Sequence, residues 1–418
     1  MASREDGDVI IPARPHMSAI RTWTTDPDQP LSQGRFVSVL RDTRLAAMLG
    51  ATLGVLFGIC FVTGLYSHLH QHPQGWLPIP PRPAGLYRFT QGLHVATGIA
   101  SVPVLLAKLW LVWPRFLSFP PVRGLAHLVE RIGILALVAG SIWMVFSGVA
   151  NIAQWYPWRF SFTASHFWMA WVTIGALVAH IGAKWVETRR SLGLPSRRPR
   201  LAEADPVLGA VAEPPPSQRV SLSRRGFLAT VAGTSAALTL TTLGQTFSPL
   251  RRVALLAPRD PSVGPQGYPV NRGAANARVV ERARAPDYRL EVSGRVATPL
   301  SLDLAQLYTL STHHAVLPIA CVEGWSYSAR WRGVRIRELL ATAGAAPGRT
   351  ILVESLEPNG AYRTSTLNPQ QARDRDALLA THLDDEALAL DHGFPCRLIA
   401  PNRPGVLQTK WVARVVVL

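Results

Sequence analysis

Residues 45–67 read Leu-Ala-Ala-Met-Leu-Gly-Ala-Thr-Leu-Gly-Val-Leu-Phe-Gly-Ile-Cys-Phe-Val-Thr-Gly-Leu-Tyr-Ser and contain no charged side chain. A helix needs about 20 consecutive apolar residues to cross the hydrocarbon core of a bilayer. Three further stretches of this length follow, at 91–113, 130–152 and 164–185. Tryptophan and tyrosine residues gather at their ends, where a membrane meets water. The pattern predicts a membrane all-α domain over residues 45–190, in which four helices form a bundle.

The positive charges beside these stretches predict how the chain crosses the membrane. Arginines are frequent before the first span, between the second and third, and after the fourth, whereas the loops at 68–90 and 153–163 hold only three. Loops rich in arginine and lysine face the cytoplasm. We therefore expect a multi-pass protein of the bacterial inner membrane, with a cytoplasmic tail at residues 1–44 and a cytoplasmic linker at residues 191–223.

The composition agrees with a membrane location. Hydrophobic residues make up 48% of the 418 positions and charged residues only 17%, below the roughly 25% of soluble domains. The net charge of +17 comes largely from basic residues beside apolar spans, not from one face interleaved with aromatic residues. A lipid bilayer is thus the expected partner, and nucleic acid is not. The three cysteines, Cys60, Cys321 and Cys396, lie too far apart to indicate a zinc site or a disulfide framework.

A further apolar segment begins after the run Ser223-Arg224-Arg225-Gly226-Phe227-Leu228 and ends near residue 247. The targeting residues Arg224 and Arg225, followed by Phe and Leu, resemble a twin-arginine export signal, which implies the twin-arginine translocase as a partner during biogenesis. A plain membrane anchor with flanking arginines is the alternative. We expect residues 224–247 to form a signal anchor and fifth transmembrane helix, which places residues 248–418 outside the cytoplasm.

The region after residue 248 has the alternating pattern of a soluble domain. Short apolar–polar runs are separated by glycine and proline, which indicates an α+β domain that is mostly β. The predicted strands are 288–294, 350–354, 397–400 and 412–417, and the predicted helices are 301–310, 334–343 and 369–381.

Three histidines lie within the apolar spans, where ionisable residues are costly and therefore point to function. His94 is near the outer start of the second span, and His166 and His180 are in the fourth. The fourteen residues between the latter two place them on one helix face, about 21 Å apart. Because His94 and His166 have matching depth, we expect them to be the axial ligands of one b-type haem. Hydrogen bonding between helices is the alternative.

This layout is similar to the four-helix haem b subunits of formate dehydrogenases, which carry two paired histidines on the fourth helix. The resemblance implies an inner haem at His180, but the first span has no histidine to pair with it, and Lys108 and His127 are poor ligands. We therefore predict one haem b and leave a second open. The histidines of residues 68–72 are expected to form a solvated loop cluster, with haem ligands or a quinone site as alternatives.

Cys321 follows a predicted strand, in the run Ile319-Ala320-Cys321-Val322-Glu323-Gly324-Trp325-Ser326. A soft thiolate is an apt ligand for a molybdenum centre that also bears a pterin dithiolene. This run, with Trp331-x-Gly333 after it, looks like the molybdenum-ligand segment of the sulfite oxidase family, and in particular of its periplasmic methionine sulfoxide reductase branch. The resemblance implies that Cys321 ligates molybdenum. Glu323 and Trp325, in the same run, are our candidate catalytic residues beside it. A buried structural thiol is the alternative.

Further motifs carry the resemblance through roughly residues 270–418. The segment 288–304 reads as the family's opening strand and helix, and the segments 392–397 and 410–411 resemble its late cofactor-binding segments. Arginine and lysine suit the phosphate of the pyranopterin, to which arginine adds bidentate geometry. The resemblance assigns cofactor binding to His392, Arg397 and Lys410, and to Asn271 in the motif Tyr268-Pro269-Val270-Asn271.

Around the metal, the sequence departs from the sulfite-oxidising members. They place an arginine just after the cysteine to bind their anionic substrate, whereas this chain has Glu323, Gly324 and Trp325. An acidic and aromatic rim disfavours sulfite and suits a neutral sulfoxide, an inference that the nearby Arg330 and Arg332 weaken.

Together these features predict a membrane-bound molybdenum oxidoreductase. A quinol or another membrane donor would supply electrons through haem b to an extracytoplasmic molybdopterin centre, which would reduce a small sulfoxide or a similar oxide. A sulfite-type oxidase that passes electrons toward quinone is the first alternative. A non-catalytic, cytochrome-like membrane protein is the second.

Overall fold

The computed structural model describes residue 38, residues 40–116, residue 122, and residues 124–193 and 223–418. Most of the tail expected at residues 1–44 and of the linker expected at residues 191–223 lies outside the described residues. The cytoplasmic placement of both segments stays a prediction.

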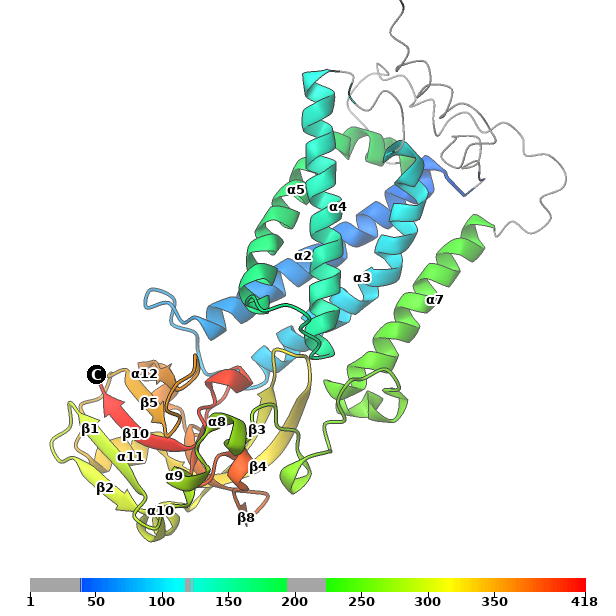
Figure 1. Cartoon of the computed structure of the whole chain (residues 1–418). Coiled ribbons are helices and arrows are strands. Elements are labelled where there is room, and N and C mark those ends of the chain that lie inside the picture. The colour runs from blue at the N-terminus through cyan, green and yellow to red at the C-terminus, as the bar shows by residue number, and fades with distance from the viewer. Residues whose placement is uncertain (1–37, 39, 117–121, 123, 194–222) are drawn as a thin grey trace, which may run out of the picture. The chain divides into compact units, whose positions relative to one another are not determined.

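Long apolar helices coincide with the five stretches expected to span a membrane (Figure 1). In the described part of the chain they are α2 (Thr43–Gln71), α3 (Leu86–Phe116), α4 (Leu125–Ile152), α5 (Phe162–Ser191) and α7 (Arg224–Thr242). Each belongs to a segment long and apolar enough to cross a membrane. The helices extend beyond the apolar runs because their polar end residues continue the helical hydrogen bonding. The fifth is shorter than the expected 224–247, because a 3₁₀ turn, η2 (Leu243–Gln245), follows it. The crossing of a membrane and the four-helix bundle remain predictions.

The chain divides into two compact units. One comprises Met1–Gly54, Pro103–Ala139 and Gly175–Gly233, and the other comprises Val55–Val102, Gly140–Ile174 and Thr234–Leu418. The second unit contains the predicted site residues other than His180 and the arginine pair of α7. Each contact described below joins residues of the same unit.

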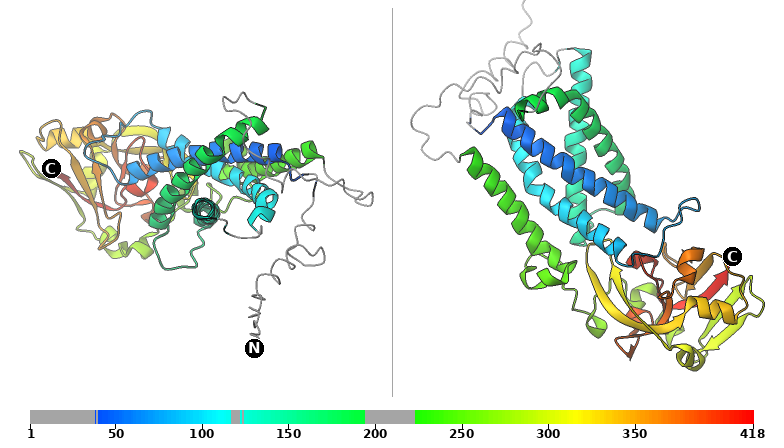
Figure 2. Two further views of the ribbon diagram at one scale, coloured as in Figure 1. Left: turned by 90° about the horizontal axis from the view of Figure 1, so that it is seen from above. Right: turned by 180° about the vertical axis from the view of Figure 1, so that it is seen from behind.

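Two β-sheets build the C-terminal region, and both views in Figure 2 show its strands, coloured from yellow-green to red, gathered in one body. The strands are β1 (Arg289–Gly294), β2 (Leu300–Asp303), β3 (His313–Ala320), β4 (Ser326–Arg335), β5 (Ile351–Ser355), β6 (Thr364–Leu367), β7 (Leu378–Leu383), β8 (Glu386–Ala387), β9 (Arg397–Ile399) and β10 (Val412–Val417). One sheet has the order β2-β1-β10-β5-β6, and the other has the order β3-β4-β7-β8 with β9 also paired to β7. β1 and β10 run parallel, and the other pairs are antiparallel.

Side chains from both sheets share one core. Leu290 and Val415 of the first sheet and Leu379 and Leu398 of the second are fully buried in the same apolar cluster. The apolar–polar alternation of β1 contributes to this arrangement, because successive side chains point to opposite faces of a sheet. Burial of each such side chain contributes about 1.5–3 kcal/mol, so the sheets form a firm support for the loops between their strands.

Short helices connect the strands. They are α8 (Ala274–Ala277), α9 (Val280–Arg284), α10 (Leu304–Leu310), α11 (Ile336–Thr342) and α12 (Pro369–Arg373), with 3₁₀ turns η3 (Ser248–Val253), η4 (Pro265–Gly267), η5 (Leu390–His392) and η6 (Gly405–Leu407). The strands expected at 288–294, 350–354, 397–400 and 412–417 are confirmed within one residue at each end. The domain is α/β and mostly β, in agreement with the sequence.

The helix expected over residues 369–381 is wrong beyond Arg373. Residues 378–383 instead form β7, whose side chains are all buried and which pairs with β4, β8 and β9. An unbroken apolar strand between two neighbours is indistinguishable from a short buried helix by its pattern alone. The helix expected over 301–310 begins at Leu304, because residues 300–303 pair with β1 as β2. The helix expected over 334–343 begins at Ile336, because β4 extends to Arg335.

Candidate functional site

A tight turn between β3 and β4 presents Cys321. Its N–H donates to the carbonyl oxygen of Trp325 at 2.9 Å, and the N–H of Gly324 donates to the carbonyl oxygen of Cys321 at 3.1 Å. Gly324 has a φ of +92°, in the left-handed region that residues with a Cβ rarely adopt. The Cys321 side chain is 5% exposed, so the turn holds a thiol at the edge of the apolar core.

Asn271 connects the thiol to Trp325. Its Nδ2 donates to the Cys321 Sγ at 3.0 Å, and its Oδ1 accepts from Trp325 Nε1 at 3.0 Å. Burial raises the pKa of Cys321 to about 12, and the Glu323 carboxylate acts in the same direction. A thiolate at this position therefore requires a cation, which a bound metal ion provides.

Glu323 lies in a hydrogen-bonded network beside Cys321. One of its carboxylate oxygens accepts from Gln154 Nε2 at 2.5 Å and from Trp325 Nε1 at 3.3 Å. Arg259 Nε lies 3.9 Å from the same oxygen, and Arg259 also donates to the Gln154 side chain. Burial raises the pKa of Glu323, which the bond from Gln154 and the charge of Arg259 oppose. Gln154 and Arg259 were not predicted, because neither lies in a motif near Cys321 in the sequence.

A row of aromatic rings leads away from the cysteine turn. The Trp325 and Tyr327 rings stack with centroids 6.0 Å apart, and Tyr327 stacks on Tyr268 at 4.4 Å. Tyr268 meets the ring of His392 edge to face, at 6.4 Å. The row links the predicted catalytic residues to the predicted cofactor-binding residues.

The predicted cofactor-binding residues His392, Arg397 and Lys410 meet around Gly393. A Cβ on Gly393 would lie 3.0 Å from the Arg397 Cβ and 3.1 Å from the Lys410 Cβ, and its φ is +112°. Glycine is thus required for the segments 392–397 and 410–411 to approach each other here. The His392 Nε2 donates to the Pro265 carbonyl oxygen at 2.7 Å, and burial lowers the pKa of His392 to about 4.

The two cations of this cluster are bonded to carbonyl groups. Arg397 is 4% exposed and donates to the carbonyl oxygens of His392 at 3.0 Å and Gln408 at 3.3 Å. Within the described residues, its Nε has no hydrogen-bond partner. Lys410 Nζ donates to the Asp391 carbonyl oxygen at 3.0 Å, and burial, with the charge of Arg397, lowers the pKa of Lys410 to about 7. The carboxylates of Asp391 and Glu357 act electrostatically on Lys410, whereas in the described part of the chain Arg397 has no such partner. A buried cation without a carboxylate is suited to an anion such as phosphate.

In the long helices, His94 on α3 and His166 on α5 face each other, with ring centroids 6.4 Å apart. The His94 Nδ1 donates to the Cys60 carbonyl oxygen at 2.9 Å, and the His166 Nδ1 lies 2.9 Å from Ser147 Oγ. Ser147 Oγ itself donates to the Trp143 carbonyl oxygen, so it accepts from His166. Both Nε2 atoms thus keep a lone pair for a metal ion.

The spacing of this histidine pair fits a haem iron. A bond between a metal ion and an imidazole nitrogen is about 2.0 Å long, so two rings with centroids 6.4 Å apart could hold one metal ion between them. Glycines flank both rings: a Cβ on Gly64 would lie 3.0 Å from His94 Cε1, and one on Gly148 would lie 3.8 Å from His166 Cε1.

His180 belongs to the other unit, where its charged neighbours include Lys108 and Lys184. In the described part of the chain, no second histidine ring lies against it. The arginine pair of the proposed export signal opens α7, and Arg224 pairs with Asp42 at 3.3 Å.

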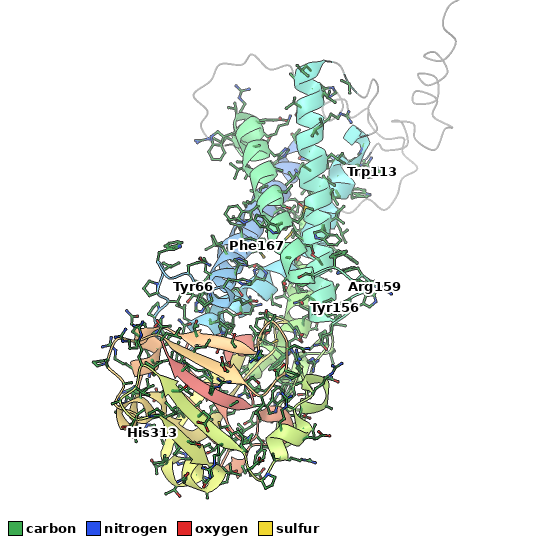
Figure 3. All side chains as sticks on the ribbon, turned by 60° about the vertical axis from the view of Figure 1, so that its left-hand side comes forward. Tyr66, Trp113, Tyr156, Arg159, Phe167 and His313 are labelled. Carbon is green, nitrogen blue, oxygen red and sulfur yellow. The ribbon has the colours of Figure 1, made fainter. Side chains whose placement is uncertain are left out.

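The histidines of residues 68–72 depart from the expected solvated loop. α2 continues to Gln71, His68 stacks on Phe167 with centroids 3.7 Å apart, and His70 is only 3% exposed. Phe167, on α5, is labelled in Figure 3 together with Tyr66, whose ring meets His70 at 4.4 Å. Only His72 is exposed.

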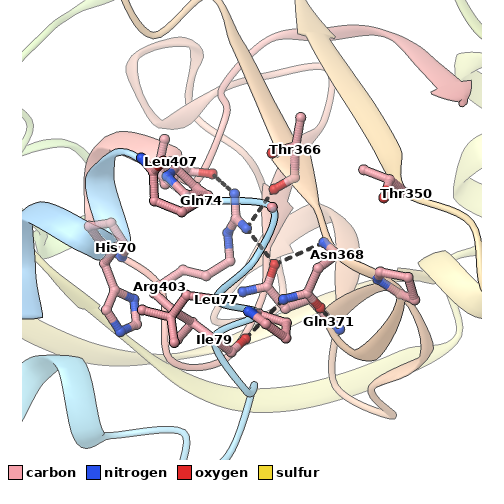
Figure 4. A pocket seen from close by; sticks show the side chains of 15 residues that line it. His70, Gln74, Leu77, Ile79, Thr350, Thr366, Asn368, Gln371, Arg403 and Leu407 are labelled. Carbon is pink, nitrogen blue, oxygen red and sulfur yellow. Dashed lines mark hydrogen bonds between the residues drawn. The ribbon is translucent and has the colours of Figure 1, made fainter.

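A pocket of about 210 Å³ lies beside His70 (Figure 4). Its lining comes from the connection after α2 and from the segments around β6, α12 and η6. Arg403 crosses it and donates to the Thr366 carbonyl oxygen at 2.8 Å and to Gln371 Oε1 at 2.9 Å. The lining includes none of the predicted catalytic or cofactor-binding residues, so this pocket is separate from the Cys321 turn.

Comparison with known proteins identifies the C-terminal region. Residues 276–418 match the family model of the oxidoreductase molybdopterin binding domain. This region carries a molybdopterin-binding domain. The matched residues include Cys321, His392, Arg397 and Lys410, whereas Asn271 and Arg259 precede them.

Relatives share this molybdopterin-binding domain. Mitochondrial sulfite oxidase of Drosophila melanogaster is 31% identical over 156 residues, which cover 31% of this chain and 27% of that protein. Its counterpart in Homo sapiens is 31% identical over 158 residues, covering 31% and 29%. The NAD(P)H nitrate reductase of Hordeum vulgare is 31% identical over 184 residues, covering 37% and 20%. The domain is thus homologous to those of two kinds of oxidoreductase, and the chain spans less than a third of the length of these relatives.

Among solved structures, the sulfane dehydrogenase SoxCD from Paracoccus pantotrophus is 26% identical, with 32% of this chain and 38% of that chain covered and a TM-score of 0.29.

Proposed function

We propose that the chain is a membrane-bound molybdenum oxidoreductase that passes electrons between the quinone pool, haem b and an extracytoplasmic molybdopterin centre, and that it reduces sulfoxides or similar oxides. The observation that carries this proposal is the buried Cys321, which lies in one unit with the buried cation Arg397 and with a histidine pair whose ring centroids are 6.4 Å apart.

The residues of the molybdopterin-binding domain fit the cofactor. Cys321 supplies a thiol that is converted to thiolate by a metal cation, and Asn271 orients it. Arg397 and Lys410 would hold the phosphate, and His392 lies beside them. Bound molybdenum and pterin supply two-electron oxygen-atom chemistry. The chain supplies the ligand, the anion site and the selection of substrate.

Arg259 and Arg330 both lie against carboxylates, which favours a neutral substrate over an anionic one. Arg259 lies against Glu323, and Arg330 pairs with Asp385 through its guanidinium. An arginine already matched to a carboxylate attracts an anion such as sulfite weakly. Glu323, Trp325 and the hydroxyl of Tyr156, labelled in Figure 3, offer polar and aromatic groups to a sulfoxide. The balanced reaction is R₂SO plus a quinol giving R₂S, a quinone and water, with two electrons and two protons transferred.

His94 and His166 fit one haem b, and we propose that this haem connects the quinone pool to the molybdopterin-binding domain. Inner-membrane location, export of residues 248–418 by the twin-arginine translocase, and the likeness to the periplasmic methionine sulfoxide reductase branch belong to the same proposal. A second haem at His180 has less support, because the described residues offer it no histidine partner.

The visible spectrum of the detergent-purified protein tests the proposal. With haem reduced by a quinol analogue, methionine sulfoxide should bleach the α band, and the Cys321→Ser variant should not respond. With haem oxidised, sulfite should leave the spectrum unchanged. A preparation without a haem band, or without molybdenum, would contradict the proposal.

The second candidate is a sulfite-type oxidase with electrons flowing toward quinone. The likeness to mitochondrial sulfite oxidases favours it. Reduction of the haem by sulfite would select this direction. A non-catalytic cytochrome-like protein, the third candidate, predicts no bound molybdenum.

A further inference from the structure

Two of the long helices reach the carbonyl group next to Cys321. Gln91 Nε2 on α3 donates to the Val322 carbonyl oxygen at 3.1 Å, and Asn151 Nδ2 at the end of α4 donates to the same oxygen at 3.2 Å. The Tyr156 hydroxyl donates to Asn151 Oδ1 at 3.0 Å, which turns the Asn151 amide nitrogen toward Val322. Both lone pairs of this carbonyl oxygen are therefore occupied.

The same two helices fix the histidine pair. Gln91 precedes His94 by three residues on α3, about 4.5 Å along the helix axis. Asn151 follows Ser147 by four residues on α4, about 6 Å along the axis, and Ser147 Oγ accepts from His166. Gln91 thus lies about one helical turn from His94, and Asn151 lies about one helical turn from Ser147, the hydrogen-bond partner of His166.

Close packing leaves no room for a layer of water between the cysteine turn and α3. A Cβ on Gly324 would lie 2.9 Å from a methyl carbon of Val95 on α3. Thr246, after α7, donates through its hydroxyl to the Gly324 carbonyl oxygen and accepts from Ser326 Oγ at 2.8 Å. The turn is therefore bound to α3, to α4 and to the segment after α7.

We propose that Gln91 and Asn151 are positioning residues for electron transfer, because they hold the Cys321 turn against the helices of the histidine pair. Through the backbone from Val322 to Cys321, Gln91 forms a bonded route from the helix of His94 to the proposed molybdenum ligand. Asn151 forms a second route from α4, where Ser147 bonds to His166. Electronic coupling falls less steeply along covalent and hydrogen bonds than across an unbonded gap. In the loaded protein one electron at a time would pass from the haem toward the molybdenum centre, and a quinol would supply its replacement. This inference rests on the proposed function.

Leucine variants of the two amides test the inference in the loaded, full-length protein. Gln91→Leu, Asn151→Leu and the double variant remove the donors and nearly keep the volume. Gln71→Leu, which removes an amide that bonds only to Ser67 among the described residues, is the matched control. After flash reduction of the haem, the decay of its α band reports electron transfer to molybdenum. We expect the double variant to slow this decay at least tenfold, each single variant to slow it less, and the control to match the unmodified protein.

The haem spectrum, the haem potential and the molybdenum content should stay unchanged in every variant. An unchanged decay rate in a double variant with both cofactors bound would overturn the inference and leave the proposed function standing. Absence of haem or molybdenum from the unmodified protein would overturn both.

A milder variant covers the case in which the double variant does not assemble. Gln91→Asn keeps the amide but shortens it by one methylene, so its nitrogen no longer reaches Val322. We expect a slower decay and faster hydrogen exchange at the amides of residues 321–324, the second readout being independent of cofactor loading. If neither the decay of the α band nor the hydrogen exchange changes, the inference is overturned. Faster exchange with an unchanged decay would show that Gln91 has a structural role only, which also overturns the inference.

Discussion

Cys321 lies in surroundings that oppose its ionisation. Burial and the Glu323 carboxylate raise the pKa of its thiol to about 12, while the bond from Asn271 acts in the opposite direction. The protein therefore holds the sulfur in place, and a bound cation makes it a thiolate. Arg397 and Lys410, around Gly393, show the complementary situation. Burial lowers the pKa of both side chains, and a bound anion would favour their charged forms.

Replacement of the thiol tests its role as a ligand. Cys321→Ser keeps the size of the side chain but replaces the soft sulfur with a hydroxyl, so we expect oxidoreductase activity to fall by at least about 100-fold. The haem spectrum should not change. Cys396→Ser is the control, since Cys396 is buried against Tyr288 in the core and should leave bound molybdenum unchanged. Elemental analysis and turnover measure both effects, and full activity in Cys321→Ser would contradict the assignment.

Lys410 gives the cofactor-free protein a pH-dependent stability. Burial lowers its pKa from 10.5 to about 7 in the folded state, so the unfolded chain binds more protons between these pH values. The free energy of unfolding should therefore decrease as the pH falls from about 10 to 7. Denaturation of the cofactor-free protein at several pH values measures this slope. The Lys410→Met variant should show a flatter slope, and so should the unmodified protein with bound phosphate. A slope in Lys410→Met equal to that of the unmodified protein would show that Lys410 is not the source of the pH dependence.

At the scale of elements, a short segment of α4 contacts both the histidine pair and the Cys321 turn. Ser147 fixes the ring of His166, and Asn151, one turn later, bonds to the carbonyl oxygen of Val322. A helix is suited to this because its rigid backbone keeps the two groups at a fixed separation.

Loss of the serine hydroxyl should weaken haem binding. Ser147→Ala removes the acceptor that orients His166, and loss of such a partner lowers metal affinity by about 10- to 100-fold. Haem titration of the apo-protein and the haem potential measure the effect. Ser141→Ala, at another buried serine of α4, is the control and should bind haem as the unmodified protein does. Equal affinities for the two variants would show that the hydroxyl does not orient the ligand.

The turn between β3 and β4 depends on glycine for both conformation and space. Gly324→Ala would place a Cβ at a φ of +92° and 2.9 Å from Val95, so we expect a loss of about 1–3 kcal/mol in the free energy of unfolding. Gly85→Ala is the control, because a Cβ there meets no atom within 4 Å and its φ is not positive. Denaturant unfolding of both variants measures the difference, and equal stabilities would argue against strain at this turn.

On the scale of the whole molecule, we propose that the arginine pair at the start of α7 decides where the molybdopterin-binding domain acts. If the domain receives its cofactor in the cytoplasm and works outside, it must cross the membrane folded, and the resemblance to a twin-arginine signal meets this need. Arg224 also pairs with Asp42, so substitutions here should retain positive charge.

Lysine at both arginines of α7 should prevent export. Arg224→Lys with Arg225→Lys keeps the charge of the helix end but removes the pair that the translocase reads, so residues 248–418 should become resistant to protease added to spheroplasts. Arg189→Lys with Arg190→Lys, at the end of α5, is the matched control and should leave the domain accessible. Accessibility equal to that of the unmodified protein in the α7 variant would contradict the export signal.

The sequence alone was sufficient for features that depend on neighbouring residues. The long apolar helices are confirmed because about 20 consecutive apolar residues are a local property of the chain. The strand that ends before Cys321 was also expected, but the turn at Cys321 and the strand β4 after it were not, although both lie within a few positions of the cysteine. The match of residues 276–418 to the molybdopterin-binding domain confirms the family that those motifs implied, and the roles of the single residues stay predictions.

Only the tertiary structure decided the contacts that join distant segments. Gln154 reaches Glu323 from 169 positions away, and Gln91 reaches Val322 from 231 positions away, with no motif at either amide. The strand β7 was misassigned for the same reason, because its pairing partners and not its own residues determine whether an apolar run becomes strand or helix. Side chains of this kind are placed by the packing of the whole chain, whereas the apolar runs and the cysteine turn are set by local sequence.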